Sequence, residues 1–256
     1  MLCNLGYSTT ICEYDLNGFE TKRYFLDNLG RNVLLQYDNS AYGMFVRVNN
    51  QYGQSIEYAY YDELGNKMDN AEGYHRNVYL YDSIGNNLSV KYFDSKDKPC
   101  KYRGFESESR YKYNEFNRIV EIAYFDENGN PCQSGGGSAK LTFEYNLQGA
   151  ITKMSYWGID GKLQENSSSY AYVTYEYDEK GNEIKKQFFN ASAQLCAADN
   201  GWATIMTYYD PKTNFISAYK DYDVKGNLVL ENRYVTDDRG NVVKRYALDS
   251  KGKLLK

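Results

Sequence analysis

The chain holds few side chains of the types and spacing that catalysis needs. His75 is the only histidine among 256 residues, so a nucleophile, a base and an orienting group would all depend on this one imidazole. In other copies of the repeat described below, the same position is alanine: Ala139, Ala171 and Ala203. We therefore expect His75 to be a packing residue, and we expect no catalytic residue and no enzymatic activity.

Acidic residues are numerous, and two kinds of chemistry use such residues. Paired carboxylates hydrolyse glycosidic bonds, and this option stays open, although most of the aspartates begin a turn. The segment Asp126-Glu127-Asn128-Gly129-Asn130 is similar to part of a calcium loop. It lacks the distal bidentate glutamate and the aspartate spacing of such loops. The sequence favours a hairpin turn over a calcium site here.

Three of the five cysteines share one position of the repeat. Cys100, Cys132 and Cys196 are separated by multiples of 32 residues, and Gln164 takes the remaining place. If each copy adds two strands to a sheet, equivalent residues lie roughly 9–10 Å apart, beyond the ~7 Å between Cα atoms that a disulfide spans. Neither further histidines nor CxxC spacing is present for zinc. We expect a ladder of small apolar thiols, with no metal and no cofactor.

These residues belong to a repeat that extends along the whole chain. Its first marker is a turn beginning with Asp or Asn, found at Asp15, Asn50, Asp82, Asn114, Asn146, Asp178, Asp210 and Asp237. A second marker follows 12 residues later, at Asp27, Asp62, Asp94, Asp126, Gly158, Asn190 and Asp249, whereas Asp223 follows after 13. Self-similarity with a period of 20–50 residues is typical of a solenoid, propeller or array.

Each copy is predicted to be two strands joined by a tight turn. In one copy, residues 170–177 are rich in aromatic and β-branched residues, as strands are. The turn Asp178-Glu179-Lys180-Gly181 combines an aspartate that can accept backbone hydrogen bonds with a glycine that tolerates positive φ. The chain returns through residues 183–189 and turns again at residues 190–193. A variable connector then leads to the next copy.

Alternation of residue types predicts the two faces of the sheet. Apolar residues lie one and three positions before the first turn, as at Tyr79 and Tyr81, and in a matching column on the second strand, while Ser, Glu, Lys and Gln lie between them. One face should be buried and the other wet. The second strand ends in an aromatic pair, such as Tyr92-Phe93, which places one ring on each face.

A further column of rings lies eight residues before the first turn: Tyr7, Tyr42, Tyr74, Tyr170 and Trp202. If these rings are exposed, they form a ladder for a ligand, and if they are buried, they form part of the core. With 29 tyrosines, the core should consist of aromatic rings whose hydroxyls reach the polar edge.

We therefore expect an all-β fold, an antiparallel β-hairpin repeat array in the form of a β-solenoid or spiral β-sheet. Residues 1–256 should form one array of eight units of about 32 residues. The unit boundaries are predicted at 6–40, 41–72, 73–103, 104–136, 137–168, 169–200, 201–228 and 229–256. Such tight turns join antiparallel strands.

Composition excludes several functions. The net charge of −4 leaves no basic stripe for nucleic acid. No apolar run is long enough to insert in a membrane, and no secretory signal is present. Because the sequence begins at the start of a repeat and ends within one, we expect a segment of a larger protein, with uncapped ends that self-associate or contact neighbouring modules of the same polypeptide.

The turns YDEKGN (177–182), YDELGN (61–66), YDSIGN (81–86) and YDVKGN (222–227) resemble the YD repeats of the RHS and teneurin-like families. This resemblance covers all eight units. It implies strand-turn-strand units wound into a β-sheet shell or spiral. It also implies an encapsulating, display or adhesion module of a bacterial surface or secreted protein.

A second resemblance implies a different function. The aromatic-aromatic-Asp-x-x-Gly turns, together with Asn200-Gly201-Trp202, are similar to the choline- and glucan-binding cell-wall repeats of Gram-positive bacteria. In those repeats the rings hold quaternary ammonium groups or sugars, for which cation–π attraction and apolar stacking are suitable.

Two functions are therefore expected. The first is a non-enzymatic β-repeat scaffold or protein-interaction and adhesion module, cell-surface or secreted, with a protein partner. The alternative is a carbohydrate- or cell-wall-binding module that holds a glycan on stacked rings. Candidate ligand-binding residues come from the ring column and from the connectors between units: Tyr42, Tyr74, Tyr102, Phe105, Tyr170 and Trp202. The connector run 167–169 is a further distinctive segment.

Overall fold

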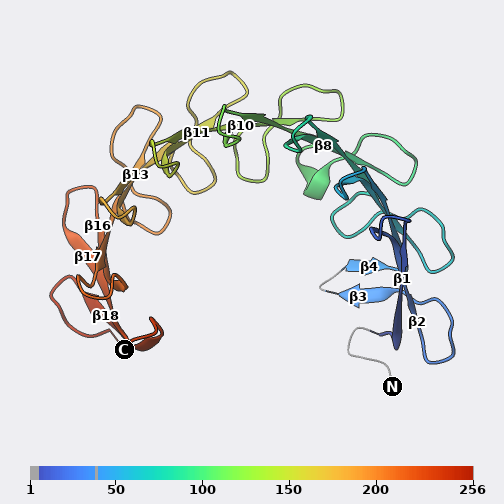
Figure 1. The fold of residues 1–256 in the computed structure, drawn as a ribbon. Coiled ribbons are helices and arrows are strands. Elements are labelled where there is room, and N and C mark those ends of the chain that lie inside the picture. Colours follow the sequence, from blue (N-terminus) through green and yellow to red (C-terminus); the bar gives the residue numbers. More distant parts are fainter. Residues whose placement is uncertain (1–5, 38–39, 256) are drawn as a thin grey trace. The chain divides into compact units, whose positions relative to one another are not determined.

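The computed structural model describes residues 6–37 and 40–255. The chain divides into two compact units, Met1–Gly135 and Gly136–Lys256. Within each unit, antiparallel β-hairpins follow one another in chain order (Figure 1). The predicted all-β antiparallel hairpin array is confirmed, whereas the organisation as a single array stays a prediction. Within the described ranges, no helix has the length and hydropathy needed to span a membrane.

Over its described residues, 6–37 and 40–135, unit 1 contains ten strands and one turn of 3-10 helix. Eight strands pair in the order β1-β2-β5-β6-β7-β8-β9-β10, and β3 pairs with β4 in a small separate sheet. The elements are β1 (Thr9–Tyr14), β2 (Glu20–Leu26), β3 (Leu35–Tyr37), β4 (Ser40–Tyr42), β5 (Met44–Asn49), β6 (Ser55–Tyr61), β7 (Arg76–Tyr81), β8 (Asn87–Phe93), η1 (Tyr102–Gly104), β9 (Glu108–Tyr113) and β10 (Ile119–Phe125).

In unit 2, residues 136–255 form eight strands in sequential order. They are β11 (Lys140–Tyr145), β12 (Ile151–Trp157), β13 (Tyr172–Tyr177), β14 (Glu183–Phe189), β15 (Thr204–Tyr209), β16 (Ile216–Tyr222), β17 (Leu228–Thr236) and β18 (Val242–Asp249). Between β16 and β17 the turn at Asp223 leads straight into the next strand. This copy has no connector, and its irregular 13-residue step follows from the turn after Asp210, which is one residue longer than the other first turns.

The turns form as their residue types predict. Asp178 Oδ1 accepts hydrogen bonds from the backbone N–H groups of Lys180 and Asn182 at 2.9 and 2.8 Å. Its second oxygen accepts one from Asn182 Nδ2 at 2.9 Å. Gly181 has φ of +83°, a conformation that glycine adopts without a steric penalty. Hydrogen bonds from the side-chain amide and the backbone N–H of Asn182 are the main reason that the pKa of Asp178 is lowered.

One sheet face carries a chain of packed aromatic rings. In unit 1, successive ring centroids lie 5.3 Å apart for Tyr42–Tyr60, 5.8 Å for Tyr60–Tyr74 and 4.9 Å for Tyr74–Tyr92. These contacts are edge-to-face, an arrangement that the ring quadrupole favours. We call this the aromatic face. In unit 2, the same face holds a core around Val173 and Phe188.

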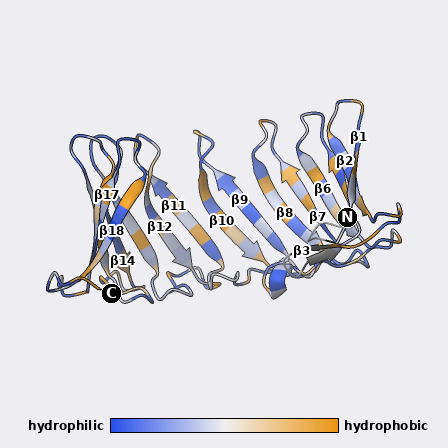
Figure 2. Ribbon diagram, turned by 90° about the horizontal axis from the view of Figure 1, so that it is seen from below, coloured by the Kyte–Doolittle hydropathy of each residue, from blue (hydrophilic) through white to orange (hydrophobic). Residues whose placement is uncertain are grey.

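The prediction that the opposite face is wet was wrong in part. Polar and apolar residues alternate along the strands (Figure 2), yet this face buries small residues at its centre. Each small residue lies directly opposite a long side chain: Ala59 opposite Arg76, Ser89 opposite Arg110, Ser155 opposite Tyr172, and Ala218 opposite Arg233. The small residues are therefore at most 8% exposed, as expected when long side chains lie over them.

In four copies of the repeat, the tyrosine before the first turn is hydrogen-bonded to the preceding repeat. Its hydroxyl donates to the backbone carbonyl of the residue 26 positions earlier, at the start of the preceding hairpin's second strand. The four pairs are Tyr81–Ser55 (3.0 Å), Tyr113–Asn87 (2.9 Å), Tyr177–Ile151 (2.8 Å) and Tyr209–Glu183 (3.0 Å). We call these bonds the tyrosine latches. Their regularity explains why tyrosine recurs beside the turn.

Removing one latch is expected to lower stability measurably. Tyr113→Phe keeps the ring but leaves the carbonyl of Asn87 without this donor, and the free energy of unfolding should fall by about 1 kcal/mol. Tyr52→Phe is the matched control, because the Tyr52 side chain is exposed at a turn and should change stability by less than about 0.5 kcal/mol. Urea unfolding curves measure both. Equal effects would contradict a structural role for the latch.

Candidate binding surface

The residues considered for catalysis make structural contacts within the fold. His75 is buried, its Nδ1 donates to the carbonyl of Tyr60 at 2.6 Å, and its ring lies edge-on to Tyr61. Asp126 Oδ1 accepts from the backbone of Asn128 and Asn130 at 2.9 and 2.8 Å. Within the part of the chain that the structure describes, no group of three or more His, Cys, Asp or Glu is placed to hold a metal.

The cysteine column lies at the turns that lead into the connectors. Cys100, Cys132 and Cys196 are free thiols of intermediate exposure. Their backbone N–H groups donate to carbonyls of the preceding strands, as Cys100 does to Tyr92 at 3.0 Å. Burial raises the pKa of the Cys100 and Cys132 thiols to about 11, so these groups are protonated at neutral pH and are weak nucleophiles.

The predicted ring residues do not form one exposed ladder. Tyr74 is buried, whereas Tyr42, Tyr102, Tyr170 and Trp202 are partly exposed. In unit 1, Tyr74 and Tyr102 lie together with ring centroids 6.1 Å apart, and Tyr42 lies farther along the same face against Tyr60. In unit 2, Tyr170 packs on Phe188 at 4.8 Å. These rings therefore contribute to packing, and their role in ligand binding stays a prediction.

Phe105 is the predicted ring with the most solvent contact, at 46% exposed. It follows η1 in the connector between β8 and β9. Glu72 Oε1, in the preceding connector, accepts from Tyr102 Oη at 3.2 Å and from Arg103 Nη2 at 2.6 Å. The backbone N–H of Arg103 also donates to the carbonyl of Glu72 at 2.8 Å. These bonds fix the connector in place, and we call Glu72, Tyr102, Arg103 and Phe105 the connector ridge.

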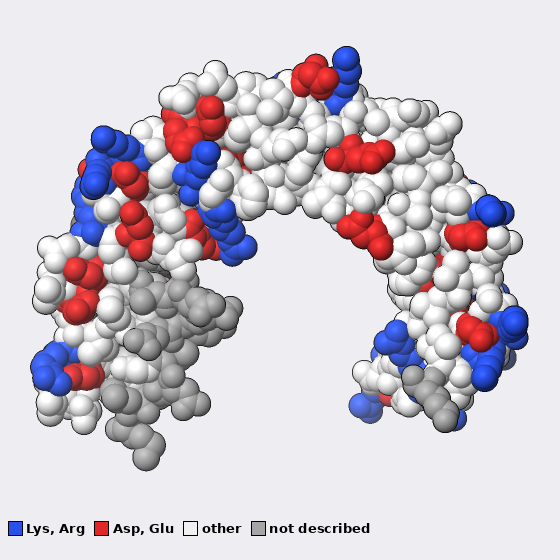
Figure 3. Space-filling model, turned by 180° about the vertical axis from the view of Figure 1, so that it is seen from behind, with Lys and Arg blue, Asp and Glu red and all other residues white. Residues whose placement is uncertain are grey.

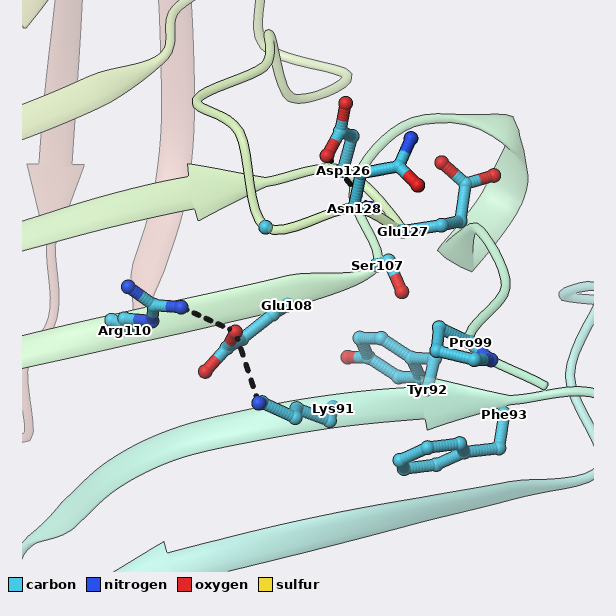
Figure 4. Close-up of a pocket in the computed structure, with 11 residues that line it drawn as sticks. Lys91, Tyr92, Phe93, Pro99, Ser107, Glu108, Arg110, Asp126, Glu127 and Asn128 are labelled. Atoms are coloured by element: carbon cyan, nitrogen blue, oxygen red, sulfur yellow. Dashed lines mark hydrogen bonds and ion pairs between the residues drawn. The ribbon is translucent and has the colours of Figure 1, made fainter. Parts of the chain in front are cut away.

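A pocket of about 260 Å³ lies on the opposite face of unit 1 (Figure 4). Glu108 is buried at its centre, with one carboxylate oxygen 2.8 Å from Arg110 Nη2 and 3.4 Å from Lys91 Nζ. Burial alone would raise the pKa of Glu108, but the bonds from the two cations outweigh burial and lower it. Glu108 is therefore ionised at neutral pH and cannot serve as a general acid.

This pocket recurs at the equivalent place earlier in unit 1. A cavity of about 520 Å³ is lined by Tyr24, Leu26, Met44 and the turn at residues 62–65. These correspond to Lys91, Phe93, Glu108 and the turn at residues 126–129. The ion cluster itself recurs in unit 2, where Glu231 binds Arg233 at 2.7 Å and lies 3.8 Å from Lys220. This cluster was not predicted from the sequence. In both copies a glutamate is followed two residues later by an arginine, and a lysine lies on the preceding strand.

Unit 2 contains a pocket of a different character, with a volume of about 500 Å³. Its walls are the rings of Tyr209, Phe215, Tyr219 and Tyr234, and Asn214 and Thr236 supply polar groups. Apolar walls with a few polar groups are typical of small-molecule sites. None of the predicted ring residues lines this pocket. Phe215 enters it because the turn after Asp210 is one residue longer than the others, with Asp210 N–H donating to the Phe215 carbonyl.

Charges on the surface are mixed. Acidic and basic side chains lie beside one another on the face drawn in Figure 3, and many pair across a hairpin, such as Lys112–Glu121 at 2.8 Å and Lys185–Glu176 at 2.9 Å. Exposed pairs of this kind contribute little to stability. On the face drawn in Figure 3, groups of opposite charge therefore offset each other locally.

No protein-family model matches this chain, and no curated protein matches it. Similar folds occur in the solved structures of TcdB2-TccC3 (13% identity, TM-score 0.31, 94% of this chain and 14% of that chain) and of the Photorhabdus luminescens Tc holotoxin pore (12%, 0.28, 96% and 15%). A porin-like protein from Bacteroides uniformis is also similar (13%, 0.30, 85% and 88%). This chain thus spans about one seventh of the toxin chains. At these scores the likenesses carry no argument about function.

Proposed function

We propose that this chain is a non-enzymatic β-repeat scaffold that binds a protein partner, as a surface or secreted module of a larger protein. The observation that carries this proposal is that the reactive side chains of the chain make contacts within the fold. The turn aspartates accept backbone hydrogen bonds, the tyrosine hydroxyls bond one repeat to the preceding repeat, and the thiols are half-buried. Phe105 of a connector and Leu64 of a turn are among the large apolar side chains that lie in solvent.

The connector ridge is the proposed contact surface of unit 1. Phe105 offers an exposed ring two residues after the exposed Arg103, and both residue types are enriched at protein interfaces. The ridge is held in position by the hydrogen bonds to Glu72, so little conformational entropy is lost when a partner binds.

A comparative capture experiment tests this proposal. The full chain, a Phe105→Ser/Arg103→Ser variant and a Phe116→Ser control would be immobilised and exposed to extracts of the source organism. We expect at least one protein that is retained by the wild type and the control and is lost from the ridge variant. A set of captured proteins that is identical for all three would overturn the ridge as the binding surface.

A glycan-binding function is the second candidate, because the ring-lined pocket of unit 2 favours it. Aromatic walls stack on the apolar faces of sugar rings, and Asn214 and Thr236 offer groups for hydroxyl hydrogen bonds. Binding of soluble oligosaccharides, measured by calorimetry, should be lost in Tyr219→Ala if this candidate is right. Wild-type protein that binds no oligosaccharide would reject it.

A further inference from the structure

One arginine of the aromatic face has no acceptor for its guanidinium. Arg47 of β5 lies three residues before a first turn, a position at which four other copies have a ring: Tyr79, Tyr111, Phe143 and Tyr175. Its Nε is buried without a hydrogen-bond partner, and no carboxylate of residues 6–37 and 40–255 forms an ion pair with it. Buried donors in proteins are nearly always paired. Because the side chain is only half-buried, its outer N–H groups are available to an acceptor on another molecule.

A second polar group on the same face also lacks a partner. Asn77 of β7 is 6% exposed. Its Nδ2 donates to Tyr79 Oη at 3.0 Å, whereas its Oδ1 is buried and accepts no hydrogen bond. Strand register places the two groups in one row, because Arg47 lies opposite Tyr58 and Tyr58 lies opposite Asn77. A donor and an acceptor without partners therefore flank one tyrosine, on strands that are two spacings apart, roughly 9–10 Å.

Unit 2 shows that these two residue types can satisfy each other. Asn232 takes the position of Asn77 in its own copy, five residues before the first turn, and is similarly buried. Its Oδ1 accepts a hydrogen bond from Arg245 Nη2 at 3.0 Å, and the guanidinium of Arg245 lies over the Tyr234 ring. In unit 1 the ring of Tyr58 separates the arginine from the asparagine. The two can be joined there by a ligand that lies across the ring.

The ring between the two groups is a partly exposed platform with a positive charge beside it. Tyr58 stacks on Phe45 with ring centroids 4.8 Å apart and an angle of 24° between the planes. The Cζ of Arg47 lies 5.4 Å from the Tyr58 centroid. Glu20 already receives two hydrogen bonds from the guanidinium of Arg23, at 2.7 and 2.9 Å. The charge of Arg47 is therefore left unbalanced, which favours an anionic ligand.

We propose that Arg47, Tyr58 and Asn77 bind a hexuronate, the carboxylate-bearing sugar unit of acidic polysaccharides. The C–H face of the sugar stacks on Tyr58, Arg47 donates to the carboxylate, and a hydroxyl at the opposite edge of the sugar donates to Asn77 Oδ1. An aspartate or glutamate side chain supplies the carboxylate alone, without the flat apolar face. The site shares no residue with the ring-lined pocket of unit 2, and it does not rest on the binding of a protein partner.

Calorimetric titration of the full chain with a short oligogalacturonate tests the proposal. The methyl ester of the same oligosaccharide is the uncharged probe, and an oligoglutamate is the charged probe without sugar. Arg47→Gln keeps an aliphatic stem over the rings and removes the charge. The matched control is Arg245→Gln, which removes an arginine that also lies over a tyrosine ring but already has Asn232 as its acceptor. Circular dichroism checks that all three proteins are folded.

We expect the wild type and Arg245→Gln to bind oligogalacturonate equally, and Arg47→Gln to bind it at least about tenfold more weakly. The methyl ester should bind the wild type more weakly by a similar factor. A wild type that binds no oligogalacturonate would overturn the proposal, as would equal binding by Arg47→Gln or an equal loss in Arg245→Gln. Oligoglutamate that binds the wild type as tightly would overturn the assignment to a sugar, because stacking on Tyr58 would then contribute nothing.

Discussion

Phe188→Ala is expected to lower the free energy of unfolding by about 3–5 kcal/mol. Phe188 is buried in the core of unit 2, where it packs with Val173 and Ala198 and with the partly buried Tyr170. Truncation removes the ring and leaves a cavity between neighbouring strands that are hydrogen-bonded to each other and cannot easily close it. Guanidinium unfolding followed by circular dichroism measures the loss.

Phe105→Ala is the control for this truncation. The same substitution removes a ring that is nearly half exposed in the connector ridge, so the loss should be well below that at Phe188. If both variants lost the same stability, the aromatic face would not be the core of the hairpins, and the assignment of the two faces would be wrong.

Asp221→Asn is expected to stabilise the protein at neutral pH. Asp221 is only 2% exposed and occupies the position at which other copies place the first ring of the aromatic pair, such as Tyr92 or Phe188. Burial raises its pKa from 3.8 to about 6. The difference corresponds to about 3 kcal/mol between the protonated and ionised forms, an upper limit for the gain because the asparagine amide must also be buried.

The sign of the pH dependence follows from the two pKa values. Below pH 4 the carboxyl is protonated in both the folded and the unfolded chain, and it costs nothing. Between about pH 4 and pH 6 the folded state binds more protons than the unfolded state, so wild-type stability falls as the pH rises. Above pH 6 the full cost is present.

Unfolding free energies measured from pH 4 to pH 8 test this prediction. The stability of Asp221→Asn minus that of the wild type should be small at pH 4 and should grow to its maximum above pH 6. Asp178→Asn is the control, because hydrogen bonds lower the pKa of that partly exposed turn aspartate and its replacement should bring no gain at neutral pH. A difference for Asp221→Asn that is independent of pH would contradict a buried, protonated carboxyl.

The sequence was sufficient to predict the local structure of each repeat. Turn formation depends on contacts within five residues, such as Asp178 with Lys180 and Asn182, so residue types at fixed spacing predict it. Strand pairing within a hairpin then follows from the turn. The alternation also placed the two rings of each aromatic pair on opposite faces, as Tyr92 beside Tyr74 and Phe93 beneath Arg76 confirm.

Contacts between neighbouring repeats were not predictable in the same way. Which groups meet depends on the offset between neighbouring hairpins, and spacing along the chain does not reveal this offset. The hydroxyl of Tyr113 binds a backbone carbonyl, which has no signature in the sequence. We expected the polar residues that alternate with apolar ones to lie on a wet face, whereas Glu108 is buried and paired with Lys91 and Arg110. Tyr74 and Phe105 have similar side chains, and only their neighbours make one buried and the other exposed.

The tyrosine latches have a consequence for how such a chain changes over generations. Each hydroxyl is received by a main-chain carbonyl, which every amino acid supplies, and the four receiving residues are Ser55, Asn87, Ile151 and Glu183. A whole repeat can therefore be duplicated or deleted by recombination without a matching substitution in the repeat before it. An array joined in this way can change its length in single steps while the side chains on its outside diverge independently.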